Sequence, residues 1–174
     1  MKWDSSPVLA AGIIAGLASV SQQALALNMG NLVYEPVEPC RIVFTPTSLV
    51  PNSPQSFVAY GDGAALAGQG GDAAGCEHPR ATAAGGVAPV AIAANLVAVG
   101  ALATGGGNIV AYPSGSATPA AATINFVKGT NIANSTIIGL CEGSSCTATA
   151  HFDLMSRSST LPAVVDVQGY FYPQ

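Results

Sequence analysis

The sequence predicts an all-β protein, a single β-sandwich or jelly-roll-like domain that follows an N-terminal signal peptide. Three observations favour this fold class. Short runs rich in Val, Ile, Phe and Tyr recur along the chain, turns of Gly, Pro, Ser, Thr and Asn separate them, and no stretch has the apolar period of an amphipathic helix. The 174 residues are enough for one such domain with a buried core.

Residues 1–26 have the form of a secretory signal peptide. An uncharged apolar run over residues 8–20 follows Lys2, and Ala24-Leu25-Ala26 stands where an A-x-A cleavage site is expected. The run is shorter than the roughly 20 residues that a membrane-spanning helix needs. Cleavage after Ala26 would leave a mature β-sandwich domain at residues 27–174, in which no second apolar stretch is long enough to span a bilayer.

The mature chain is predicted to begin with an edge strand. Residues 32–37 and 40–44 are rich in β-branched and aromatic residues, and Pro36 and Pro39 interrupt them. We therefore expect two pieces of one edge or entry strand, because proline is confined to such positions in sheets. A proline-rich loop then leads to a short strand at residues 56–60.

The middle of the domain has a long loop and a buried strand. Residues 61–86 are mostly glycine and other small residues, and they predict an irregular loop because no apolar period is present. Residues 87–102 form the longest apolar segment. Its alanines favour a helix, but Pro89 and the alternation of larger apolar residues favour a buried strand. The glycine-rich segment 103–108 has the composition of a hairpin turn.

The rest of the domain is predicted to contain short strands joined by polar turns. In the terminal strand, the alternation of side chains predicts that only one face contacts the core. The expected strands are residues 108–115, 121–129 and 132–138, an exposed hairpin strand at 147–152 and a terminal strand at 163–171. The two faces of the terminal strand are Val165, Val167, Gly169 and Phe171 on one side and Val164, Asp166, Gln168 and Tyr170 on the other.

The charge of the chain argues against nucleic acid as a partner. Charged residues make up 8% of the chain, the net charge is −4, and the basic residues are scattered singly. A phosphate backbone or an anionic membrane surface needs clustered Lys and Arg. Weak charge also leaves little repulsion between copies of the protein, which permits self-association without requiring it.

Four cysteines in an exported chain predict disulfides. Cys141 and Cys146 enclose a turn-like segment and could close a hairpin end, and Cys40 and Cys76 would then pair by elimination; three connectivities are formally possible. The alternative is a zinc site that uses Cys76 and His78, with Cys141 and Cys146 as a second pair. The spacing is not that of a zinc ribbon, and export favours oxidation, so no metal is expected.

Several polar residues within strands are candidate structural residues. An unpaired amide in an apolar strand is costly, so we expect Asn95, Asn125 and Asn134 to bond backbone groups at bulges or strand ends; the alternative is a polar row that binds a ligand. Asp166 in the last strand is expected either to pair with Arg41 in the first or to be exposed without a partner.

No residues predict a reaction. His151 and Asp153 share a strand face and, with a serine, would be two members of a catalytic triad. No nucleophile-elbow or oxyanion glycine pattern accompanies them. The sequence therefore predicts no enzyme, no catalytic residue and no cofactor.

Several short motifs follow one another in the order typical of a family of exported bacterial β-domains, which often occur in tandem. That family opens with P-C-R-[IV] and D-T-R and closes with V-V-D-V-x-G-Y-F. The chain resembles it at residues 38–43 (E-P-C-R-I-V), 95–99 (N-L-V-A-V), 111–115 (A-Y-P-S-G), 124–134 (I-N-F-V-K-G-T-N-I-A-N) and 164–171 (V-V-D-V-Q-G-Y-F). Phe44-Thr45-Pro46 stands in place of D-T-R, and the interval from Cys76 to Asn95 is expanded. The resemblance implies an exported or surface-associated β-rich module and brings no catalytic residues.

The sequence thus favours a non-enzymatic structural protein that is extracellular or on the cell surface. Its expected partners are other copies of itself or components of the cell envelope, for example in a fibre, filament or sheath. If a terminal strand adds to the open sheet edge of a neighbour, residues 27–37 are the segment expected to do so.

The alternative function is a carbohydrate-binding or adhesive module. Such a module needs exposed, coplanar aromatic rings, and the candidates are Tyr60, Tyr112, Tyr170 and Tyr172. Packing in the core or in an interface is the better interpretation of Tyr112 and Tyr170.

Overall fold

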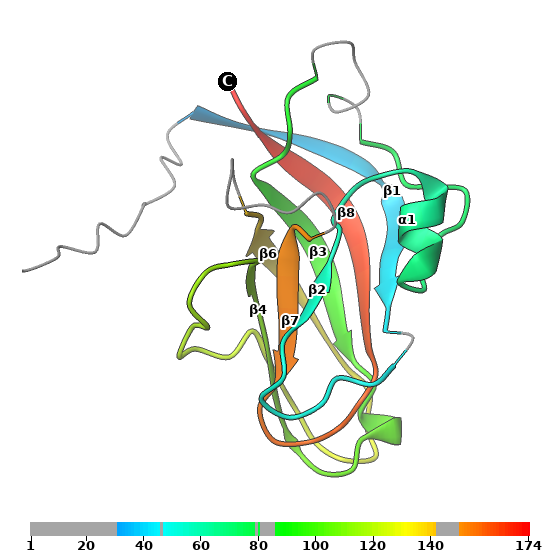
Figure 1. The fold of residues 1–174 in the computed structure, drawn as a ribbon, viewed down its shortest axis with the longest axis vertical. Helices are drawn as coiled ribbons and strands as arrows, with labels where there is room; N and C mark the ends of the chain where they lie inside the picture. Colours follow the sequence, from blue (N-terminus) through cyan, green and yellow to red (C-terminus); the bar gives the residue numbers. More distant parts are fainter. Residues whose placement is uncertain (1–30, 46, 79, 81–85, 142–149) are drawn as a thin grey trace, which may run out of the picture.

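The computed structural model describes residues 31–174, except 46, 79, 81–85 and 142–149. These residues form two four-stranded antiparallel sheets that pack face to face (Figure 1). The architecture confirms the predicted all-β sandwich. The predicted signal peptide, residues 1–26, lies outside the described residues.

One sheet has longer strands than the other, so we call them the long sheet and the short sheet. The long sheet has the order β1 (Leu32–Phe44), β8 (Ala163–Pro173), β3 (Ala91–Ala98) and β6 (Ile132–Gly139). The short sheet has the order β2 (Gln55–Phe57), β7 (Phe152–Ser156), β4 (Gly107–Pro113) and β5 (Ile124–Phe126). Two short helices complete the described elements, α1 (Gly63–Gly68) and the 3-10 helix η2 (Gly100–Leu102).

The core lies between the sheets and is built mostly from aliphatic residues. In β3, for example, Ile92, Leu96 and two alanines point inward, as the predicted alternation requires. A smaller apolar cluster of Val110, Tyr112 and Met155 lies on the outer face of the short sheet. Strand β7 is therefore buried on both faces.

Two local predictions are wrong, and a third lies largely outside the described residues. The predicted exposed strand at 147–152 falls largely outside the described residues, and the strand found there, β7, begins at Phe152 and is buried. The glycine-rich segment 103–106 joins strands of different sheets, not the two strands of a hairpin. The predicted irregular loop contains helix α1, which Asp62 caps by accepting a hydrogen bond from the Ala65 amide.

The two predicted pieces of the first strand are one strand. β1 runs without interruption beside β8 and is an edge strand, as expected. Its register shifts between Pro36 and Cys40 and between Arg41 and Val43. Such bulges let a strand continue past residues that cannot donate to the ladder.

The alternation along β8 changes phase, contrary to the prediction. Ala93 pairs with Gly169 but Ala94 pairs with Val167, so Gln168 is an extra residue in a bulge. An extra residue turns every later side chain to the opposite face. Tyr170 therefore points into the core, and Phe171 points outward.

Residues 69–72 close the side of the sandwich between β1 and β2. The Gln69 side chain donates from Nε2 to the carbonyl oxygens of Ile42 (2.7 Å) and Val58 (2.8 Å), and its Oε1 accepts from the Val58 amide (3.0 Å). The backbone adds a bond from the Phe44 amide to the Gln69 oxygen. Gly70 has a φ of 78°, and a Cβ there would overlap the Phe44 carbonyl oxygen. One side-chain amide thus bridges the edges of both sheets.

Two further contacts fix this segment. Leu66 of α1 is fully buried in the core. The predicted disulfide between Cys40 and Cys76 is present and joins β1 to the segment that follows α1. In Figure 1, α1 lies beside β1 on the side away from β8. Cys141 is not a free thiol, and its predicted partner Cys146 lies outside the described residues.

We predict that Gln69→Ala destabilises the fold by roughly 2–3 kcal/mol, because three half-buried backbone groups lose their partner. Gln55→Ala is the matched control. It removes a single side-chain bond, to the Ser48 oxygen, and should cost roughly 0.5–1.5 kcal/mol. Urea unfolding monitored by circular dichroism measures both. Equal losses in the two variants would contradict the bridging role of Gln69.

Replacing Cys40 and Cys76 together by alanine should lower stability by about 3–4 kcal/mol, because the bond closes a loop with a sequence separation of 36 residues. Thermal unfolding of the oxidised protein and of the double variant tests this. An unchanged melting temperature would show that the loop is held in place without the disulfide.

Candidate functional site

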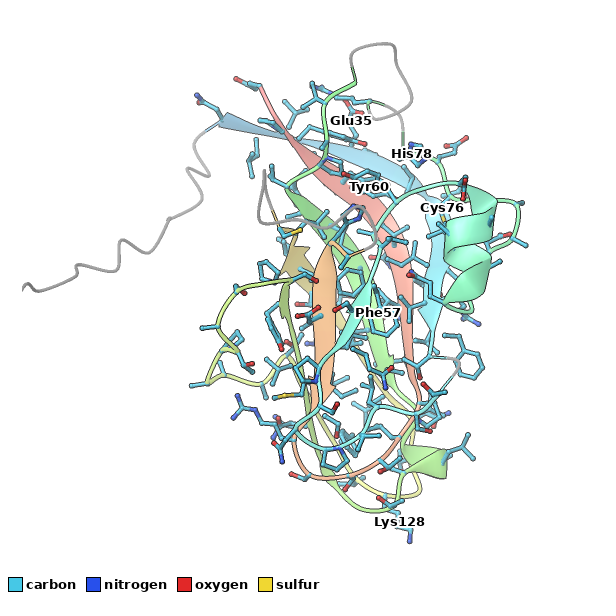
Figure 2. All side chains as sticks on the ribbon, in the orientation of Figure 1. Glu35, Phe57, Tyr60, Cys76, His78 and Lys128 are labelled. Carbon is cyan, nitrogen blue, oxygen red and sulfur yellow. A yellow bond between two sulfur atoms is a disulfide. The ribbon has the colours of Figure 1, made fainter. Side chains whose placement is uncertain are left out.

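Aromatic and histidine side chains gather at one end of the sandwich. The Tyr60 ring stacks on His151, with ring centroids 4.3 Å apart, and meets His78 edge-on at 6.1 Å. Figure 2 shows Glu35, Tyr60 and His78 at this end. We call the group the tyrosine–histidine cluster, and its members are Glu35, Tyr60, His78, Arg80, His151, Tyr170 and Tyr172.

Backbone hydrogen bonds fix His151. Its Nδ1 accepts from the Ala59 amide (2.9 Å), and its own amide donates to the Phe57 oxygen (2.7 Å). The Tyr170 hydroxyl donates to the Ala59 oxygen (3.3 Å). Because Nδ1 accepts, it carries no proton in this arrangement, and burial lowers the pKa of His151.

Arg80 covers the cluster from outside. Its guanidinium pairs with the Glu35 carboxylate and lies 5.4 Å from the centroid of the Tyr172 ring. Burial raises the pKa values of Tyr60, Tyr170 and Tyr172. The Tyr172 hydroxyl and His78 Nδ1 are buried without a hydrogen-bond partner among the described residues. These contacts hold together residues from β1, β8 and the ends of β2 and β7.

The structure does not assemble the triad that His151 and Asp153 suggested. Asp153 accepts a hydrogen bond from the Ser114 hydroxyl (2.6 Å), whereas His151 Nδ1 accepts one from the Ala59 amide. The two side chains therefore have different hydrogen-bond partners. Cys76 is oxidised and provides no thiolate, which rules out the zinc site that used it. Among the described residues, no three His, Cys, Asp or Glu side chains are placed to hold a metal ion.

The predicted structural polar residues have different environments. Arg41 and Asp166 form an ion pair, one of the two predicted alternatives, with Nε and Oδ1 2.8 Å apart, and this bond raises the pKa of Arg41. Asn134 donates to the Thr123 oxygen, as expected of a residue that satisfies a backbone group. Asn95 is half-buried and Asn125 is exposed. Asn95 and Asn134 lie on opposite faces of the long sheet and Asn125 lies in the short sheet, so the three do not form the alternative ligand-binding row.

The candidate carbohydrate-binding rings do not form an exposed platform. Tyr112, Tyr170 and Tyr172 are buried, and Tyr60 is half-buried against His151. Tyr112 and Tyr170 pack in apolar clusters, in agreement with the preferred interpretation. The bulge at Gln168, which the sequence did not predict, turns Tyr170 and Tyr172 inward.

The outer face of the long sheet is a second candidate site. Strand registers arrange its residues in four cross-strand rows, in which small and apolar residues predominate. The charged residues in these rows are Arg41 and Asp166, which neutralise each other. The rows are Phe44–Val164–Val97–Ala133, Arg41–Asp166–Asn95–Ser135, Pro36–Gly169–Ala93–Ile137 and Tyr34–Phe171–Ala91–Gly139.

Large apolar side chains on this face are in part exposed. Phe44 is 43% exposed, Tyr34 is 44% exposed and Ile137 is 56% exposed. Neither apolar cluster of the described residues lies on this face, in contrast to the outer face of the short sheet. A neutral apolar surface of this kind is typical of a site of contact with another macromolecule.

The chain matches no protein family, no curated protein and no solved structure. Among the described residues, no helix is long and apolar enough to cross a membrane.

We predict that acid weakens the fold through His151. The unfolded chain takes up a proton near pH 6.5, whereas the folded state resists it, so stability should fall as the pH drops below about 6.5. In His151→Asn the amide oxygen can replace Nδ1 as acceptor for Ala59 but does not titrate, so this part of the loss should disappear. Urea midpoints at pH 7.5 and pH 5.5 measure the effect, and an equal loss in both proteins would exclude His151 as its source.

Proposed function

We propose that this protein is a non-enzymatic extracellular structural subunit that packs against copies of itself or against components of the cell envelope. The neutral outer face of the long sheet carries this proposal. Apolar side chains such as Phe44 and Ile137 remain exposed there, although burying them would be favourable. A contact surface explains their exposure.

Charge supports the same function. A net charge of −4 on 174 residues gives weak repulsion between copies, and the one ion pair on the outer face is internal to the chain. An incoming copy would therefore meet no uncompensated charge in the four rows. The Cys40–Cys76 disulfide is compatible with an oxidising, extracellular compartment.

The tyrosine–histidine cluster fits a structural role. Its members bond one another and the backbone at one end of the sandwich. The burial of three of the four candidate rings leaves the carbohydrate-binding alternative without an observation in its favour.

The test is the state of oxidised protein spanning residues 27–174, studied by analytical ultracentrifugation over a range of concentrations and by electron microscopy. We expect concentration-dependent assembly into ordered filaments or sheets. The assembly should persist at high salt, because apolar contacts are not screened. A monomer at every concentration would refute the proposal.

A matched pair of variants tests the outer face. Val97→Lys places a charge in the middle of the four rows, whereas Val127→Lys changes a 58% exposed residue between β5 and β6, outside the rows. If the face is the contact surface, Val97→Lys weakens assembly at least tenfold and Val127→Lys leaves it unchanged. Circular dichroism confirms that both variants fold.

A further inference from the structure

The sandwich has four edge strands, β1 and β6 in the long sheet and β2 and β5 in the short sheet. An edge strand exposes backbone N–H and C=O groups that can pair with another chain. Proteins protect such edges with prolines, charges, short strands or covering loops. The four edges of this sandwich differ in that protection.

β1 is protected along its length. Residues 69–72 bond its backbone at Arg41, Ile42 and Phe44. The rest of the strand carries Pro36 and Pro39, which have no N–H to donate, together with glutamates. The sequence nominated residues 27–37 for strand addition. Of these, residues 32–36 pair with β8 of the same chain, and residues 27–30 lie outside the described part.

The two edges of the short sheet offer little to a partner. β2 and β5 have three residues each. The amide and oxygen of Val58, just after β2, are occupied by the Gln69 side chain. Strands of this length provide few backbone bonds.

Among the described residues, β6 has no proline, charge or covering backbone segment of this kind, and its Asn134 side chain donates to the Thr123 oxygen in the loop before β5. Its eight residues, Ile132–Gly139, include no proline and no charge. β3 pairs with β6 along its whole length on one side, and on the other side no backbone hydrogen bond joins β6 to another described residue. Ala133, Ser135 and Ile137 are exposed. A long, uncharged edge without proline is the kind that associates with other strands.

We propose that β6 is the edge at which two copies of this chain join, antiparallel, so that their long sheets become one continuous sheet. This inference rests on the proposed self-association and adds an edge contact through β6 to the contact proposed for the outer face. A second copy is the occupant that matches, because an uncharged edge meets an identical uncharged edge and each supplies the backbone groups that the other lacks.

The side chains select a register. In an antiparallel pair, residues directly opposite each other lie on the same face, so a two-fold axis through β6 must pass at a residue. An axis at Ser135 places Ile137 opposite Ala133 of the second copy and Ile132 opposite Ile138. An axis at Thr136 would oppose Ile138 to Asn134, a poorer match. We therefore place the axis at Ser135.

Cysteine cross-linking tests both the edge and the register in the oxidised protein of residues 27–174. Opposite Cα atoms are about 4.5–5.5 Å apart, within the range of a disulfide. Ser135→Cys should form a covalent dimer under mild oxidation. Ser116→Cys, an exposed residue in the loop after β4, is the control and should stay monomeric.

The register predicts a second pattern. Ala133→Cys and Ile137→Cys should cross-link when the two variants are mixed. Neither should cross-link alone, because equivalent residues four positions out of register are about 13 Å apart along the strand, at roughly 3.3 Å per residue. Cross-linking of Ser135→Cys no faster than Ser116→Cys, and none in the mixture, would overturn the inference.

A charged substitution on β6 distinguishes a failure of the proposed interface from a failure of the proposed function. Asn134→Lys, at an exposed residue of β6 outside the four outer-face rows, should remain monomeric at concentrations at least tenfold above those at which the unchanged protein assembles. Leu102→Lys, at a 66% exposed aliphatic residue in η2, should assemble normally. If the unchanged protein assembles and Asn134→Lys assembles equally, β6 is not the interface and the proposed function stands. If the unchanged protein never assembles, both fail.

Discussion

The closure of one side of the sandwich by the Gln69 side chain is the interaction on which the rest of the structure depends. Two sheets that pack face to face leave their edge strands unpaired, and β1 and β2 face this problem on the same side. The side-chain amide of Gln69 takes the place of a neighbouring strand. Its Nε2 donates two hydrogen bonds and its Oε1 accepts one, all with backbone groups of Ile42 and Val58. Leu66 in the core and the disulfide at Cys76 hold the segment in place.

This closure makes the two edges of the long sheet unequal. Residues 69–72 cover one part of β1, and the rest of the strand carries prolines and glutamates. β6, at the opposite edge, is uncharged and unprotected among the described residues. The outer face between them is also neutral, because Arg41 and Asp166 compensate each other. The long sheet thus has one covered edge and one open edge among the described residues, an arrangement that would let copies associate at one edge only, as we propose.

The sequence predicted those parts of the fold that depend on local alternation and on a few distinctive residues. The alternation in β3, the edge position of β1 and the Cys40–Cys76 bond were predicted correctly. The Arg41–Asp166 pair was one of two alternatives that the sequence left open. Helix α1 was missed because it has only one buried apolar residue, too few to give a period, although Asp62 followed by small residues is a capping signal.

Other features could not be predicted because they depend on contacts between distant segments. The bulge at Gln168 is set by pairing with β3, and it alone decides that Tyr170 and Tyr172 point inward. The tyrosine–histidine cluster joins residues near positions 35, 60, 80, 151 and 170, which have no shared local pattern. The open edge at β6 depends on the pairing order of the strands in both sheets, which no local sequence pattern shows.

Amide hydrogen exchange, followed by mass spectrometry on the oxidised protein at low and at high concentration, tests the central claim most directly. If two copies join through β6, the peptide that contains Ile132–Gly139 should exchange more slowly as the concentration rises, while peptides from β1 and β2 exchange at unchanged rates. The claim would be contradicted if exchange slowed with concentration in β1 but not in β6. It would also be contradicted if exchange were independent of concentration in every peptide.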